Sequence, residues 1–266
     1  PFISSMIASR GYRATFVATG VLQGLVIVAV AQFLRHPPTE AAAAKPVAGG
    51  ASQLGRRHFT TAEMLRTPQF YVMYAMFVLM ASGGLLVTAN AGPMARSWGL
   101  TAAALALAAT LSPLANGASR IFWGWVSDRL GRETTMIVAF LLQAVCLSLV
   151  VALGQISGAW FALTLVLVYF TWGEIYSLFP SIAADYFGTR HATSNYSVLY
   201  TAKGVASIIG GWFGALLFER SGSWAMGFHG SAVMALVAAG MALALRASNA
   251  AAKARAASLP VAVAAK

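Results

Sequence analysis

The stretch Gly124-Trp-Val-Ser-Asp128-Arg129-Leu-Gly131-Arg132 is a short polar turn between two long apolar runs. A run of roughly 20 mainly apolar residues is long enough to cross a lipid bilayer as a helix. In such a turn the aspartate can cap or pair with a neighbouring helix end, and a glycine lets two helices approach. The arginines favour the cytoplasmic side of a membrane. The stretch therefore predicts two membrane helices joined by a tight connection.

The composition indicates an integral membrane protein throughout. The 266 residues are 59% hydrophobic and only 9% charged, whereas a soluble domain carries about 25% charged residues. The net charge of +11 is not gathered into a basic stripe with interleaved aromatic residues, so we expect the lipid bilayer as a partner and no nucleic acid. Cys146 lies in an apolar run, which is typical of a buried or lipid-facing side chain.

Seven apolar runs have the length of a membrane helix. They are residues 15–34, 70–90, 101–126, 133–153, 158–184, 194–218 and 224–246. Residues 1–13 have the pattern of the end of another membrane helix and a short loop. The expected organisation is 1–34, a polar linker at 35–67, a helical region at 68–246 and an alanine-rich tail at 247–266. In the linker, Thr60 and Glu63 have capping-box spacing, which predicts a short surface helix.

The loop cations predict the orientation, because cytoplasmic loops carry an excess of lysine and arginine. With the linker and the C-terminus cytoplasmic, twelve cations lie on that side and four on the other. The remaining two of the 18 are Arg120 and Lys203, each in the middle of an apolar run. Ionisable groups at that depth usually face a partner or a water-filled cavity. The pair therefore predicts a binding site for an anion.

Polar and aromatic residues accompany these cations at helical spacing. Trp172 and Tyr176, at i and i+4 in another apolar run, share one helix face and can form a wall of the same cavity. Tyr200 is three residues before Lys203, and we expect it on the same face. Asn116 is four residues before Arg120, where it either contacts substrate or steadies the arginine.

Glu174 lies two residues from each of the two aromatic residues and so points to another helix face. It is an ion-pair partner for Arg120 or Lys203, a structural acid, or a proton carrier, and the first two roles are favoured over the third. Asp185 is expected in a cytoplasmic loop. The sequence shows no cluster of histidine and cysteine, no nucleotide-binding glycine loop and no catalytic triad. We therefore expect no metal, no cofactor and no enzyme activity.

The nine residues from Gly124 to Arg132 resemble the pattern G-x-x-x-D-R-x-G-R of the major facilitator superfamily, which lies between the second and third helices of each half. The resemblance implies an all-α membrane fold with two six-helix halves around a central cavity. It implies that Gly124, Asp128, Arg129, Gly131 and Arg132 gate and orient the helices. The chain would hold the C-terminal six-helix half, the cytoplasmic linker, helix six and the end of helix five, without the N-terminal half that is its partner.

More narrowly, the chain is similar to the oxalate–formate antiporter family, which is related to the monocarboxylate transporters. The similarity rests on Thr67-Pro-Gln-Phe70, Ala118-Ser-Arg120 with Trp123-Gly124, Trp172-Gly173 with Tyr176, Asp185-Tyr-Phe-Gly188 and Tyr200-Thr-Ala-Lys203-Gly204. It implies that Arg120 and Lys203 pair with the substrate's carboxylates and that Trp172 and Tyr176 help to enclose the substrate.

The expected function is secondary transport of small carboxylates by alternating access in the bacterial inner (plasma) membrane, with exchange of oxalate for formate as its specific form. Two cations suit oxalate, because arginine can bind one carboxylate bidentately and lysine acts as a point charge for the other. The alternatives are proton-coupled transport of lactate-like monocarboxylates, for which one cation suffices, and a truncated chain that does not transport.

Overall fold

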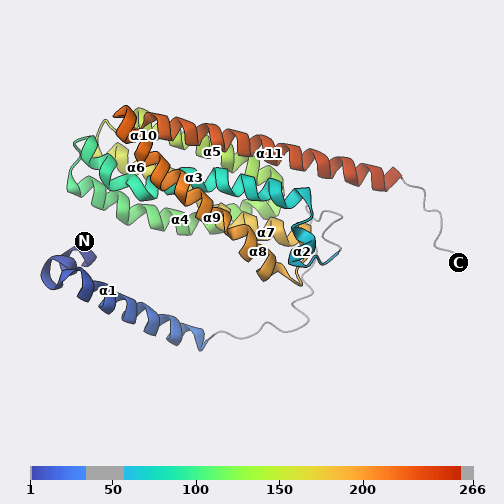
Figure 1. The fold of residues 1–266 in the computed structure, drawn as a ribbon, viewed down its shortest axis with the longest axis horizontal. Helices are drawn as coiled ribbons and strands as arrows, with labels where there is room; N and C mark the ends of the chain where they lie inside the picture. Colours follow the sequence, from blue (N-terminus) through green and yellow to red (C-terminus); the bar gives the residue numbers. More distant parts are fainter. Residues whose placement is uncertain (1, 34–56, 259–266) are drawn as a thin grey trace. The chain divides into compact units, whose positions relative to one another are not determined.

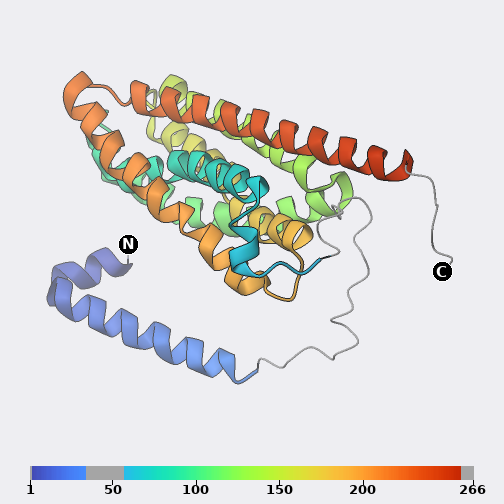
Figure 2. The same cartoon turned by 45° about the vertical axis from the view of Figure 1, so that its right-hand side comes forward.

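The computed structural model describes residues 2–33 and 57–258, which fall into two compact units. Within them, seven segments are long and apolar enough to cross a membrane, which confirms the all-helical membrane fold predicted from the apolar runs. Figures 1 and 2 show the helices in two views. Most of the predicted linker, residues 34–56, and the end of the predicted tail, residues 259–266, lie outside the described residues.

The first unit contains α1 (Phe2–Ala31), which is kinked at Gly11. The backbone there has φ 78° and ψ 165°, a conformation that glycine adopts far more readily than other residues. Residues 2–10 and the apolar run after the kink are therefore two helical segments. A single glycine stands where a short loop up to residue 13 was predicted.

The second unit contains the other six spans. Its helices are α2 (Thr61–Met64), α3 (Pro68–Ser97), α4 (Ala102–Leu130), α5 (Arg132–Leu153), α6 (Gly158–Trp172), α7 (Ile175–Phe187), α8 (Ala192–Tyr200), α9 (Ala202–Ser207), the π-helix η2 (Ile208–Phe213), α10 (Gly214–Ser221) and α11 (Ala225–Ser258). Apolar side chains of α3, α5 and α7 form much of the core. Phe77 of α3 stacks on Phe179 of α7 with ring centroids 4.6 Å apart.

Two predicted continuous spans are interrupted in their regular α-helical bonding, although Gly158–Phe187 and Ala192–Ser221 each remain one candidate membrane span. The span over residues 158–184 is divided between α6 and α7 at Gly173 and Glu174, and the span over 194–218 is divided among α8, α9, η2 and α10. Gly173 packs so tightly on α4 that an added β-carbon would overlap Ser119 Oγ and lie 2.8 Å from the Asn116 carbonyl oxygen. Irregular backbone at membrane depth is tolerated where protein encloses it or where it lines a cavity.

The end of the linker is hydrogen-bonded to the end of α7 and the start of α8. Thr60 caps α2, and Glu63 completes the predicted capping box. The Phe59 backbone N–H donates to the Phe187 carbonyl over 2.9 Å, and Asn195 Nδ2 donates to the Phe59 carbonyl over 3.0 Å. These bonds hold residues 59–64 against the helices that follow the break.

The polar turn between Gly124 and Arg132 is shorter than predicted. α4 continues to Leu130, α5 begins at Arg132, and Gly131 alone joins them with φ 85°. Arg132 forms ion pairs with Asp128 at 2.8 Å and with Asp185 at 3.3 Å. Asp185 lies in α7, which continues to Phe187, and not in the predicted loop. Its ion pair holds it against the start of α5.

Gly124 and Arg129, two other residues of this motif, do not take part in these ion pairs. An added β-carbon at Gly124 would meet nothing within 4 Å in the described structure, so the predicted close helix approach does not occur at this glycine. Arg129 Cζ lies 3.7 Å from the centroid of the Trp125 ring. A cation over an aromatic face is a favourable contact within one helix.

Candidate functional site

A cavity of about 540 Å³ lies among the helices of the second unit. Its lining consists of Pro113, Asn116, Gly117, Arg120, Tyr169, Trp172, Tyr176, Tyr200 and Lys203. All six residues predicted to bind substrate are among these nine. They come from α4, α6, α7, α8 and α9, so segments far apart in sequence contribute to one cavity.

The two cations converge on one aromatic ring. Arg120 Cζ lies 4.5 Å from the centroid of the Tyr176 ring, and Lys203 Nζ lies 5.1 Å from the same centroid. Both distances are within the range of a cation–π contact. The positive charges of α4 and α9 therefore reach the same part of the cavity, as the isolated positions of these residues in the sequence predict.

Asn116 holds the arginine in place from one helical turn away. Its Oδ1 accepts a hydrogen bond from Arg120 Nη2 at 3.0 Å, and its Nδ2 donates to the Tyr169 carbonyl over 3.3 Å. Asn116 thus connects the guanidinium group to the backbone of α6. The residue also lines the cavity, so this geometry fits both roles left open for it, steadying the arginine and contacting substrate.

Four aromatic side chains form a continuous wall of the cavity. Ring centroids are 5.7 Å apart between Tyr169 and Trp172, 5.6 Å between Trp172 and Tyr176, and 6.4 Å between Tyr176 and Tyr200. Lys203 Nζ donates to the Tyr200 hydroxyl over 3.3 Å. The wall thus places polar hydroxyl groups next to the cations.

Tyr169 is the wall residue that sequence reasoning missed. Its hydroxyl lies 2.9 Å from Thr88 Oγ1 and connects α6 to α3. Helical spacing could have predicted it, because Tyr169 precedes Trp172 by three residues and Tyr176 by seven, and residues at these spacings share a helix face. The Trp172 ring occupies the place where a β-carbon of Gly84 would be, so α3 also fixes the wall.

Glu174 does not line this cavity. The side chain is fully buried, and neither carboxyl oxygen has a hydrogen-bond partner among the described residues. Within that part of the chain it also forms no ion pair with Arg120 or Lys203. The pairing that was one of its expected roles is therefore not seen in this conformation, and the roles of structural acid and proton carrier stay open.

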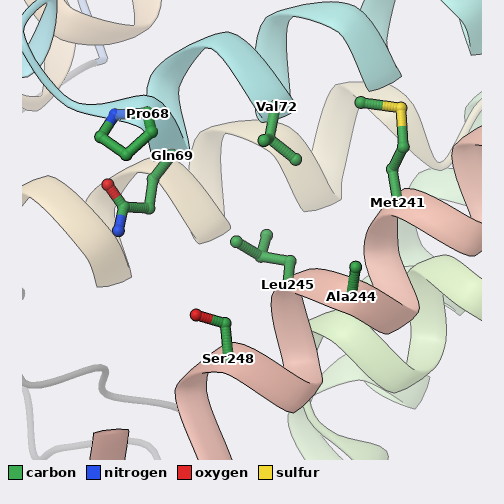
Figure 3. Close-up of a pocket in the computed structure, with 7 residues that line it drawn as sticks. All are labelled: Pro68, Gln69, Val72, Met241, Ala244, Leu245 and Ser248. Carbon is green, nitrogen blue, oxygen red and sulfur yellow. The ribbon is translucent and has the colours of Figure 1, made fainter.

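A second hollow between α3 and α11 has a different character. Figure 3 shows its lining side chains, which are Pro68, Gln69, Val72, Met241, Ala244, Leu245 and Ser248. The volume is about 250 Å³, and no charged side chain contributes to it. It is therefore unsuited to an anion. Among the described residues, no group of three or more histidine, cysteine or acidic side chains is arranged to hold a metal ion.

Comparison of the chain with known proteins identifies its family. Residues 72–264 match the Major Facilitator Superfamily. The chain is 38% identical over 238 residues to the oxalate:formate antiporter of Oxalobacter formigenes, across 90% of this chain and 55% of that protein. It is 26% identical over 206 residues to an uncharacterized transporter of the same superfamily from Escherichia coli (strain K12), across 77% of this chain and 50% of that protein.

A shorter stretch is similar to a carrier from Toxoplasma gondii. The chain is 32% identical over 84 residues to apicoplast pyruvate carrier 2 of Toxoplasma gondii, across 32% of this chain and 13% of that protein. The chain spans about half the length of the first two relatives. The match over residues 72–264, together with the candidate membrane spans, shows that the chain belongs to the major facilitator superfamily, a family of multi-pass membrane transporters and not of enzymes.

Proposed function

We propose that this chain forms the C-terminal half of a secondary transporter that exchanges small carboxylates, with oxalate and formate as its substrates. The observation that carries the proposal is the convergence of Arg120 and Lys203 on the Tyr176 ring inside one cavity. The similarity to the oxalate:formate antiporter of Oxalobacter formigenes supports the choice of substrates.

The chemistry of the cavity suits a small dianion. Oxalate has two carboxylates and no apolar surface, so two cations neutralise it completely. Arg120 can bind one carboxylate through two parallel N–H donors, while the Lys203 ammonium group attracts the other. Hydroxyl groups of Tyr176 and Tyr200 are available to donate to the same oxygens. Formate has a single carboxylate and leaves one of the two charges unmatched, which favours its release over that of oxalate.

The broken helices provide a structural basis for alternating access. Tyr176 is the second residue of α7, just after the interruption at Gly173 and Glu174. Lys203 lies in the short helix α9 between α8 and η2. Short helical segments beside a substrate site can move without unfolding a whole span. We expect an N-terminal half to cover Arg120, which is exposed in this chain.

The ion pairs of Arg132 are the proposed gate. They connect the ends of α4, α5 and α7 through Asp128 and Asp185. On the orientation predicted from the loop cations, this cluster, the linker and the C-terminus are cytoplasmic. Breaking and re-forming these pairs would then accompany opening and closing on the cytoplasmic side, in the plasma membrane of a bacterium.

Exchange by the complete transporter in proteoliposomes tests the proposal. Lys203→Gln is expected to abolish uptake of labelled oxalate against internal formate, because the second carboxylate loses its counter-charge. Arg220→Gln is the matched control, since Arg220 is an exposed cation in the last turn of α10. Unchanged oxalate exchange in Lys203→Gln would contradict the proposal. Uptake of lactate or pyruvate driven by a proton gradient, without oxalate exchange, would instead support a proton-coupled monocarboxylate transporter.

A further inference from the structure

Glu174 is an acid that the two-cation site does not use. It is 0% exposed, and both carboxyl oxygens are buried without a hydrogen-bond partner among residues 57–258. Each of the other acids described there has a polar partner or contacts solvent. Glu63, Asp128 and Asp185 pair with an arginine, Glu133 bonds to Tyr186 and Asn249, and Glu219 is exposed. Glu174 is therefore the one described acid that is both fully enclosed and unpaired.

The position of this acid connects it to the cavity. Glu174 lies in the break between α6 and α7, between Trp172 and Tyr176, whose rings line the cavity. The break is enclosed by α3 and α4, since the Trp172 ring packs on Gly84 and Gly173 packs on Ser119. A movement that opens the break towards the cavity would therefore move the aromatic wall and expose the carboxyl group together.

No charge on the surrounding helices compensates Glu174. Charged and titratable groups on the other elements of this unit have contacts of their own. Arg120 of α4 and Lys203 of α9 lie over the Tyr176 ring, Tyr74 of α3 bonds to Thr201, Tyr196 of α8 packs on Tyr200, and Glu133 of α5 bonds to Tyr186. Gln143 of α5 bonds through Oε1 to Thr171, one turn before Glu174, and its Nε2 is also buried without a partner among the described groups.

An ionised carboxylate in such surroundings costs several kcal/mol, because no opposite charge or hydrogen bond replaces water. Buried groups of this kind take their neutral form instead. We propose that Glu174 is a proton-binding site coupled to the anion cavity, which holds a proton while the break is closed and exchanges it through the cavity when the break opens. Only the identity of the anion rests on the proposed function.

The sign of the coupling follows from electrostatics. An anion bound at Arg120 and Lys203 disfavours a negative charge on a nearby carboxyl group, so bound oxalate is expected to retain the proton on Glu174. Because the coupling is reciprocal, protonated Glu174 favours oxalate binding. Oxalate affinity should therefore fall as the pH rises and Glu174 ionises, by up to about tenfold per pH unit for one linked proton.

Infrared spectroscopy of the complete transporter in detergent tests the proton directly. The carbonyl stretch of a protonated carboxylic acid is expected in the unaltered protein and in Glu219→Gln, an exposed-acid control, but not in Glu174→Gln. The band should disappear as the pH is raised. A band that is unchanged in Glu174→Gln, or that persists at every pH at which the protein is folded, overturns the inference.

Binding of labelled oxalate across the same pH range tests the coupling. Glu174→Gln carries a permanently neutral side chain and should bind oxalate with little pH dependence, whereas Glu174→Asp should restore the dependence. Identical pH dependence in the unaltered protein and Glu174→Gln overturns the coupling. If the transporter does not bind oxalate at any pH, this result contradicts the proposed function instead. The infrared titration then tests the inference by itself.

Discussion

A methyl group at position 173 is expected to force α6 away from α4. Gly173 follows the last residue of α6 with φ −64° and ψ −15°, which any residue can adopt, so the backbone conformation does not exclude alanine. An alanine β-carbon would overlap Ser119 Oγ and lie 2.8 Å from the Asn116 carbonyl oxygen. The serine hydroxyl can rotate away, but the carbonyl belongs to the backbone of α4. The two helices therefore have to separate.

The structure sets the size of the effect. Ordinary contact at a β-carbon begins at 3.4 Å, so the 2.8 Å approach requires a displacement of about 0.6 Å. Overpacking a well-packed interior costs about 1–3 kcal/mol, and the higher helix propensity of alanine offsets at most about 1 kcal/mol of this. With that full offset, we expect a net loss of up to about 2 kcal/mol in unfolding free energy. Asn116 should move with its backbone and weaken its bond to Arg120, which lowers oxalate affinity by roughly tenfold, or about 1.4 kcal/mol.

Thermal unfolding of the complete transporter in detergent, with and without oxalate, measures both effects. Gly124→Ala is the matched control in α4, because its β-carbon would meet nothing within 4 Å. This control is expected to be neutral or slightly stabilising. Adding Ser119→Ala to Gly173→Ala should restore only part of the stability, since the backbone contact remains. Equal unfolding midpoints for Gly173→Ala and Gly124→Ala would refute the reasoning.

Three further predictions concern the ends of the helices. Asn195→Ala leaves the Phe59 carbonyl without its side-chain donor and should cost about 1–3 kcal/mol, seen as faster hydrogen exchange over residues 59–64; unchanged exchange would contradict a fastening role. Hydrogen bonds from the Thr60 backbone and side chain lower the pKa of Glu63. Protection of α2 should therefore be present above the ordinary carboxyl pKa and be lost as the pH falls through the lowered value. Glu63→Gln should abolish that pH dependence, and its persistence would assign the effect to another group. Arg132→Gln removes both ion pairs at once and should change the ratio of inward-facing to outward-facing transporters in a cysteine-accessibility assay; an unchanged ratio would exclude the gating role.

Several features were predictable because membrane and helix geometry act locally. Hydrocarbon requires long apolar runs, so the positions of the spans could be found by composition alone. The same requirement made Arg120 and Lys203 stand out, since no loop explains them. Helical spacing then placed Asn116 beside the arginine and Tyr200 beside the lysine, and the structure shows hydrogen bonds at both positions. These predictions needed only neighbours within one or two helical turns.

Contacts between distant segments decided the rest. The sequence predicts one regular helix over residues 158–184, yet its regular bonding is interrupted at Gly173 and Glu174, where α6 packs closely on α4. Whether Glu174 pairs with a cation also depends on the direction of its side chain relative to other helices. Helical spacing predicts only which face of its own helix the residue lies on. The amino-acid sequence by itself thus determined the membrane spans and the charged residues of the cavity. Only the tertiary structure decided the breaks, the Tyr169–Thr88 contact and the isolation of Glu174, because each depends on side chains that meet across helices and not along one.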